Sequence, residues 1–181
     1  MEIKNGERHK ITVCIYEFLG TAFLAYSVLM SYGNGLAVSL TVFAVIIVAG
    51  PVSGANINPA VSIGIFIQEK KFGQDIVLLL LMIVSQILGA LFGILMTIGC
   101  LYNPNLNNSL VPTSKVPILA PIDESSLPVV SGYQLQTFLS QVILTFVFIL
   151  LVLVLKGRNT NPAKSDVAGA FLVASVLLGC I

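Results

Sequence analysis

Four long stretches of this sequence carry no charged residue, and they constrain the fold more than any other feature. Lys, Arg, Asp, Glu and His are absent from Phe18–Gln68, Ile76–Ser114, Ser125–Leu155 and Val167–Ile181. A helix needs about 20 apolar residues to cross the ~30 Å hydrocarbon core of a bilayer, and the first three stretches all exceed that length. The pattern predicts an all-α polytopic membrane protein.

The composition excludes several classes of function. Only 9% of the 181 residues are charged and 56% are hydrophobic, whereas a typical soluble domain has about 25% charged residues. A net charge of +1 offers no basic surface for nucleic acid. A nucleic-acid-binding protein, a secreted disulfide scaffold and a soluble enzyme are therefore excluded. No grouping of His, Ser or Cys predicts catalysis, and we expect no enzymatic activity, cofactor or metal ion.

The basic residues predict the orientation in the membrane. We expect spans at about 11–31, 36–49 or a little further, 76–102 and 135–155, and a shorter fifth segment from Val167. If the spans alternate in direction, eight of the nine Lys and Arg residues lie on the side of the N-terminus. Cytoplasmic loops are rich in Lys and Arg, so we expect residues 1–10 to form a cytoplasmic tail and 103–134 an extracellular loop. Asn107 in that loop begins a candidate glycosylation sequon. Whether the membrane is the plasma membrane or that of an internal vesicle stays open.

An interruption between the second and third spans predicts a re-entrant half-helix. We expect Gly50-Pro51 to stop the second span, while Asn58-Pro59 suits the cap and first position of a new helix. That helix, 58–68, would be about 16 Å long at ~1.5 Å per residue, half the thickness of the bilayer. Because it must end on the side of Lys70-Lys71, we expect it to begin near the midplane. The alternatives are a Pro-kinked helix and a loop outside the membrane.

Non-helical backbone at that depth carries a chemical prediction. It is tolerated only when it is buried in protein or lines an aqueous cavity, so Gly54–Ile57 should present carbonyl groups to a polar path. The Asn58 side-chain amide can donate a hydrogen bond to a passing oxygen atom. The positive end of the half-helix dipole disfavours cations and protons.

A ten-residue run resembles a known family. Ser53-Gly54-Ala55-Asn56-Ile57-Asn58-Pro59-Ala60-Val61-Ser62 closely resembles the first signature loop of the major intrinsic proteins, the aquaporins and glycerol facilitators, whose usual form is SGAH-x-NPAVT. Asn56 replaces the usual His, and Ser62 replaces Thr. Further similarity lies in Glu17–Thr21, Gly35–Val38 and Gln86–Ala90. The resemblance implies an inverted repeat, with a first half at 11–102 and a partial second half at 135–181.

The resemblance also implies roles for single residues. A charge within a span is costly, so Glu17 should pair with backbone N–H groups or line the interior. By resemblance Glu17 braces the half-helix loop, and Gln141 takes the equivalent place in the second half as a neutral group. The family's outer filter would take Val38 and Cys180, whose small side chains imply a constriction that passes glycerol, urea or ammonia as well as water. Simple packing of both side chains is the alternative.

The triplet Asn161-Pro162-Ala163 reads like the family's second signature but lies in the wrong place. Only 20 residues separate it from Gln141, enough for one crossing, so we expect a chance loop sequence on the cytoplasmic side. The alternative is a second half that lacks its fifth span. Asn58 follows Glu17 by 41 positions, and the same interval counted from Gln141 leads to position 182. We therefore expect a C-terminally incomplete member of the family, without the second half-helix, its filter arginine and the sixth span.

Two functional hypotheses follow. The chain is a passive channel for water and small neutral solutes, or it is a non-conducting membrane subunit that associates with full-length homologues. A coupled transporter would need more ionisable groups within its spans than Glu17. The resemblance implies a homotetramer or a hetero-oligomer with homologues, in a lipid bilayer and without nucleic acid. Gly89, Ala90 and Gly93 are small enough to pack helices closely.

Overall fold

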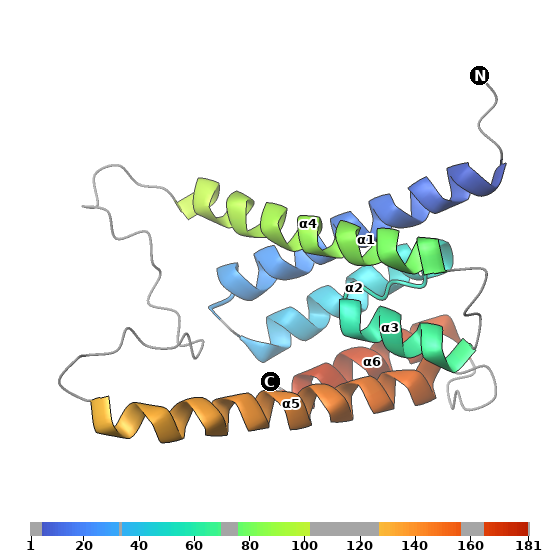
Figure 1. The fold of residues 1–181 in the computed structure, drawn as a ribbon. Coiled ribbons are helices and arrows are strands. Elements are labelled where there is room, and N and C mark those ends of the chain that lie inside the picture. The colour runs from blue at the N-terminus through green and yellow to red at the C-terminus, as the bar shows by residue number, and fades with distance from the viewer. Residues whose placement is uncertain (1–4, 33, 70–75, 102–126, 157–164, 181) are drawn as a thin grey trace.

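The fold is a bundle of helices, as predicted. The computed structural model describes residues 5–32, 34–69, 76–101, 127–156 and 165–180, and these contain six helices and no strand (Figure 1). The helices are α1 (Asn5–Met30), α2 (Gly35–Ser53), α3 (Pro59–Glu69), α4 (Ile76–Leu101), α5 (Leu127–Lys156) and α6 (Asp166–Cys180). Within these residues, α1, α2, α4 and α5 are long and apolar enough to cross a membrane, while α6 is shorter. The protein is an all-α integral membrane protein.

Helix α3 is the half-length helix. It has 11 residues, which at ~1.5 Å per residue is about 16 Å. Figure 1 shows it running from the middle of the bundle to the end at which α1 begins and α5 finishes. It contacts α4 on one side and α5 on the other. Its first helical residue is Pro59, so Asn58 lies just outside the helix at the cap position.

The prediction that Gly50-Pro51 ends the second span is wrong. Helix α2 continues through both residues to Ser53. Pro51 lies in the last turn, where its missing N–H removes one hydrogen bond to Ile47 and its ring crowds the Ile47 carbonyl, yet only two further residues of the helix follow it. The helix ends instead at Gly54, whose φ of 82° is left-handed and whose N–H donates to the Gly50 carbonyl at 3.0 Å. Glycine adopts this conformation without steric cost, so the chain can turn there.

Two other helices begin earlier than the expected spans. α1 begins at Asn5 and α5 at Leu127. The sequence prediction misses these starts because a count of apolar residues finds the membrane-length part of a helix but not its polar extension. The membrane-length parts are His9–Met30 and Phe138–Lys156. Helix α6 is capped by Ser165, whose Oγ accepts the Ala168 N–H at 3.2 Å. Asn107 and the triplet 161–163 lie outside the described residues.

Helices α1 and α4 cross in backbone contact. A Cβ added at Gly89 would collide with the carbonyl oxygen of Phe18, and one added at Gly93 would collide with that of Ala22. The approach therefore requires glycine at both positions, and the Phe18 and Phe92 rings pack beside it with their centroids 5.6 Å apart. The small residues Gly89 and Gly93 thus pack two helices of the same chain.

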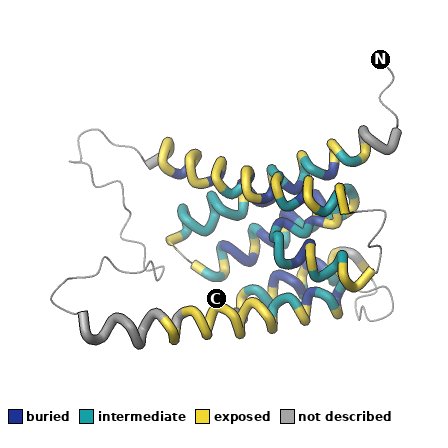
Figure 2. The backbone as a smooth tube through the Cα atoms, viewed as in Figure 1, coloured by how far each residue is buried: buried dark blue, intermediate teal, exposed yellow. Residues whose placement is uncertain are grey.

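The apolar core surrounds the segment between α2 and α3. Its buried residues come from α2, that segment, α3, α5 and α6: Val42, Val45, Ala49, Ala55, Ile57, Val61, Val152, Leu155 and Val173. Figure 2 shows α5 as the contrasting element, exposed along its described middle and buried only near its C-terminal end. The last turns of α5 are therefore the part that reaches the centre of the bundle.

Candidate functional site

The four residues Gly54–Ile57 have no helical structure and, together with the cap residue Asn58, connect α2 to α3; we call Gly54–Ile57 the re-entrant segment. Ala55 and Ile57 have φ values of 46° and 43°, in the left-handed region that residues with a Cβ rarely adopt. Each such residue costs about 1–3 kcal/mol and persists only where its surroundings over-determine the backbone. Both side chains are buried. Ile57 packs on Gly20 of α1, where an added Cβ would lie 2.7 Å from Ile57 Cγ2.

The N–H side of the re-entrant segment is bound by Glu17 of α1. Glu17 has no exposed surface. Its Oε1 accepts the Asn56 N–H at 3.0 Å, and its Oε2 accepts the Ile57 N–H at 2.7 Å. Hydrogen bonds to a carboxylate are about twice as strong as neutral ones. These are the contacts that a brace for this segment would make.

Gln86 of α4 extends this network to a third helix. It is almost fully buried, and its Nε2 donates to Glu17 Oε2 at 2.7 Å and to Ser62 Oγ at 2.9 Å. It therefore links α1, α3 and α4, while its own Oε1 is buried without a partner among the described residues. Sequence reasoning quoted Gln86 only as part of a similarity and gave it no role. The signal was present, because an amide within an apolar span must find hydrogen-bond partners.

Asn58 lies at the N-terminus of α3. Its Oδ1 accepts the Ala60 N–H at 2.8 Å, and its carbonyl accepts the Ser62 N–H at 3.0 Å. Pro59 at the first helical position has no N–H that would need a partner. The cap uses only the oxygen of the side-chain amide. Among the described residues no hydrogen bond engages Asn58 Nδ2, so this donor is available beside the re-entrant segment.

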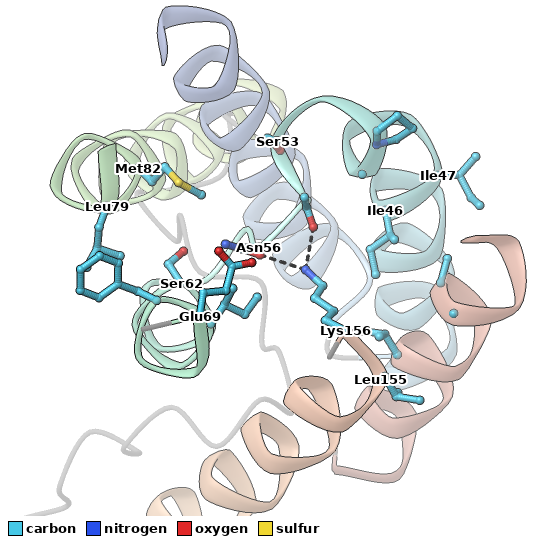
Figure 3. A pocket seen from close by; sticks show the side chains of 18 of the residues that line it. Ile46, Ile47, Ser53, Asn56, Ser62, Glu69, Leu79, Met82, Leu155 and Lys156 are labelled. Carbon is cyan, nitrogen blue, oxygen red and sulfur yellow. Dashed lines mark hydrogen bonds between the residues drawn. The ribbon is translucent and has the colours of Figure 1, made fainter. Parts of the chain in front are cut away.

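The carbonyl side of the segment is bound by Lys156, the last residue of α5. Its ammonium donates to the Gly54 carbonyl at 2.6 Å, the Ala55 carbonyl at 3.2 Å and Asn56 Oδ1 at 2.9 Å. Figure 3 shows the side chain reaching from α5 to Asn56. Sequence reasoning used Lys156 only as one of the basic residues of the N-terminal side. The sequence feature that could have pointed to Lys156 is its position directly after the charge-free stretch Ser125–Leu155.

A cavity of about 720 Å³ opens beside these groups. Its polar lining includes Ser53, Asn56, Ser62, Glu69 and Lys156, and most of the remaining wall is apolar side chains of α2, α4 and α6. Apolar walls with a few placed polar groups are typical of sites for small molecules. Within the part of the chain that the structure describes, no group of three or more His, Cys, Asp or Glu side chains could hold a metal ion.

The other predicted site residues lie apart from this network. Val38 is buried near the start of α2 and does not line the cavity. Gln141 is exposed on α5. Cys180 is the last residue of α6, and its side chain is outside the described part of the structure. The structure thus brings Glu17 to Asn56 and Ile57 of the re-entrant segment, while the filter positions and the second brace stay predictions.

Comparison with known proteins identifies the family. The family model described as Major intrinsic protein matches residues 7–181. This chain belongs to the major intrinsic protein family. Members of that family are channels rather than enzymes, and this major intrinsic protein carries the family's half-helix and signature loop in the geometry described above.

Three curated relatives are similar to this major intrinsic protein. An aquaglyceroporin of Toxoplasma gondii is 36% identical over 91 residues, which cover 46% of this chain and 35% of the relative. Aquaporin AqpM of Methanothermobacter thermautotrophicus is 30% identical over 117 residues, or 48% of this chain and 46% of the relative. Aquaporin AqpM of Methanothermobacter marburgensis is 39% identical over 66 residues, or 36% of this chain and 26% of the relative. The matched stretches cover less than half of each relative.

Proposed function

We propose that this major intrinsic protein provides a passive path for water and small neutral solutes such as glycerol, urea or ammonia. The observation that carries the proposal is the arrangement at Asn58. Its Oδ1 is committed to capping α3, so Nδ2 is left as the donor of the residue that directly follows the re-entrant segment. One donor beside a row of acceptors can replace the hydrogen bonds that a small polar molecule loses when it leaves bulk water.

The chemistry of the site supports an uncharged permeant. The N-terminus of α3 contributes a positive partial charge at Asn58, which disfavours cations and protons. The path needs no covalent step and no cofactor, because permeation exchanges only hydrogen bonds. The names aquaporin and aquaglyceroporin of the relatives support the same solute class. Val38 and Cys180 are proposed filter positions, where small side chains leave room for solutes larger than water.

The arrangement of the helix ends supports the proposed orientation. The start of α1, the end of α3 and the end of α5 lie at one end of the bundle (Figure 1). We propose that this end faces the cytoplasm, since Lys10 near the start of α1 and Lys156 at the end of α5 belong to it, and basic residues favour the cytoplasmic side. A homotetramer or hetero-oligomer with homologues is also proposed. Its interface would have to use surfaces other than Gly89 and Gly93, which already contact α1.

The test replaces the donor of Asn58 and keeps its cap. In Asn58→Asp a carboxylate oxygen still accepts the Ala60 N–H, but Nδ2 is lost. We expect the water permeability of lipid vesicles that contain the full-length protein to fall about tenfold, the factor that one hydrogen bond of about 1.4 kcal/mol represents. Stopped-flow light scattering after an osmotic step measures it, with protein-free vesicles as the baseline.

Asn34 provides a matched control. It caps α2 with the same atom, since its Oδ1 accepts the N–H groups of Leu36 and Ala37 at 3.0 and 3.2 Å, but it lies at the start of the 19-residue α2, whereas the re-entrant segment follows the other end of that helix. Asn34→Asp should leave the flux unchanged. Equal flux through the wild type and Asn58→Asp would show that Asn58 does not serve the path.

A second candidate function is a non-conducting subunit that associates with homologues. One observation favours it: Lys156 occupies carbonyl groups that a permeant would use. If neither the wild type nor a variant without this ammonium conducts above protein-free vesicles, the channel proposal fails. Co-purification with a full-length homologue then becomes the relevant assay.

A further inference from the structure

We propose that Lys156 is a tethered cation that occupies the hydrogen-bond acceptors of the re-entrant segment and closes the polar path until it withdraws. The inference rests on the proposed function, because it concerns the same path. Lys156 has no part in the signature loop and comes from a different helix, α5.

In this position each donor of the Lys156 ammonium has an acceptor. An ammonium group has three donors, and Lys156 has three acceptors, namely Gly54 O at 2.6 Å, Ala55 O at 3.2 Å and Asn56 Oδ1 at 2.9 Å. The peptide segment lies between opposite charges, since Glu17 accepts its N–H groups from the other side. Each charge polarises the peptide groups in the direction that favours the other, which makes the arrangement cooperative.

A permeant must compete with this ammonium for the same oxygen atoms. Lys156 has two advantages over a water molecule or a neutral solute. Its hydrogen bonds are charge-assisted and so stronger than neutral ones. Its attachment to α5 also gives it a high effective concentration at the segment. While Lys156 stays bound, each of the Gly54 and Ala55 carbonyl oxygens has one of its two lone pairs occupied by the ammonium, and a permeant is left with the other.

The contact can also be released. The four-carbon stem of lysine is flexible, and Lys156 is half-buried and lines the cavity of about 720 Å³ rather than a closed interface. The cavity gives the side chain room to withdraw, and the Gly54 residue that provides the shortest contact is itself exposed. The closed arrangement is therefore one of two positions of a single side chain, and no helix has to move.

The flux test compares two substitutions at this position in the full-length protein in vesicles. Lys156→Met keeps the length and apolar stem but removes all three donors. Lys156→Arg keeps a positive charge with donors. We expect Lys156→Met to raise water permeability about tenfold over the wild type, and Lys156→Arg to stay close to the wild type.

The outcomes separate this inference from the proposed function. A rise in Lys156→Met alone supports both. If the wild type and Lys156→Arg already conduct as well as Lys156→Met, the closing role of Lys156 is overturned while the channel stands. If no variant conducts above protein-free vesicles, although each is folded and inserted, the proposed function is overturned and the closing role with it.

A second measurement tests the position of the ammonium without relying on flux. Acylation of amines, read by mass spectrometry of peptides, compares Lys156 with Lys10 of α1 in the same wild-type sample. We expect Lys156 to react about tenfold more slowly, because its donors are engaged, and Asn56→Ala to reduce that difference by removing one acceptor. Reaction of Lys156 as fast as Lys10 in the wild type would overturn the inference.

Discussion

The two sides of the re-entrant segment are held by different kinds of structure. On the N–H side, α1 and α4 cross in backbone contact and enclose Glu17, which has no exposed surface and bonds to two N–H groups and to Gln86. On the carbonyl side, a single flexible side chain reaches from the end of α5 along a cavity. On the first side the hydrogen bonds come from a carboxylate that two closely packed helices enclose. On the second side Val152 and Leu155 of α5 join the apolar core, but the hydrogen bonds come from one long side chain beside a cavity.

This difference separates two tasks. The strained φ values of Ala55 and Ile57 need a rigid support, and the Glu17 side provides it because nothing there can move without exposing buried donors. The Lys156 ammonium can leave its acceptors at a small cost in free energy, since the carbonyl groups can then be solvated from the cavity. The first side should therefore determine whether the segment folds, and the second whether its carbonyl groups are available.

The largest expected effect comes from removing the support. Glu17→Ala leaves the Asn56 and Ile57 N–H groups and one of the two N–H groups of Gln86 Nε2 without an acceptor, while the other still donates to Ser62 Oγ. Each buried unsatisfied donor costs about 1–3 kcal/mol, so we expect a loss of about 3–5 kcal/mol in the free energy of unfolding. Denaturant titration in mixed micelles, followed by circular dichroism, measures it.

Thr21→Val is the matched control for Glu17→Ala. Thr21 lies one turn further along α1 and is also buried, but its hydroxyl donates only to the Glu17 carbonyl of its own helix, at 2.8 Å. Valine nearly preserves its shape, so the change should cost less than about 1 kcal/mol. Similar losses in the two variants would mean that burial on α1, rather than the contacts of Glu17, provides the support.

The second effect tests the contact between α1 and α4. Gly89→Ala places a Cβ against the carbonyl of Phe18, a backbone atom that cannot rotate away. Overpacking of this kind costs about 1–3 kcal/mol, and we expect a loss of unfolding free energy in that range by the same titration.

Gly99→Ala on the same helix should have the opposite sign. No atom lies within 4 Å of a Cβ added at Gly99, and alanine favours a helix over glycine by up to about 1 kcal/mol. If both substitutions destabilise the protein equally, the loss reflects α4 itself and not its contact with α1.

The sequence predicts those features of the fold that depend on local patterns. Charge-free stretches locate the spans, and Asn58-Pro59 locates the start of the half-helix within one residue. These signals are short-range, because capping and apolar length act along the chain. The end of α2 is missed because the helix tolerates Pro51 in its last turn, while Gly54, in the left-handed conformation, terminates it three residues later.

The long-range contacts are harder to predict from the sequence. Lys156 reaches the re-entrant segment, and Gln86 reaches Glu17 and Ser62 beside it, from helices distant in sequence, and no spacing rule relates position 156 to positions 54–56. Glu17 differs because its expected place comes from a family resemblance. A polar residue within or at the end of an apolar span predicts that a partner exists, but only the packing of the helices identifies that partner.

The smallest effect on stability is expected at Lys156, the residue with the largest proposed effect on flux. A tenfold change in occupancy corresponds to about 1.4 kcal/mol, so Lys156→Met should lower the free energy of unfolding by at most about that amount. The cost of holding an ammonium away from bulk water also disappears with it, which reduces the loss further. The same titration as for Glu17→Ala gives the comparison directly. A loss from Lys156→Met as large as that from Glu17→Ala would make Lys156 a second structural support, and the two sides of the segment would then no longer differ in kind.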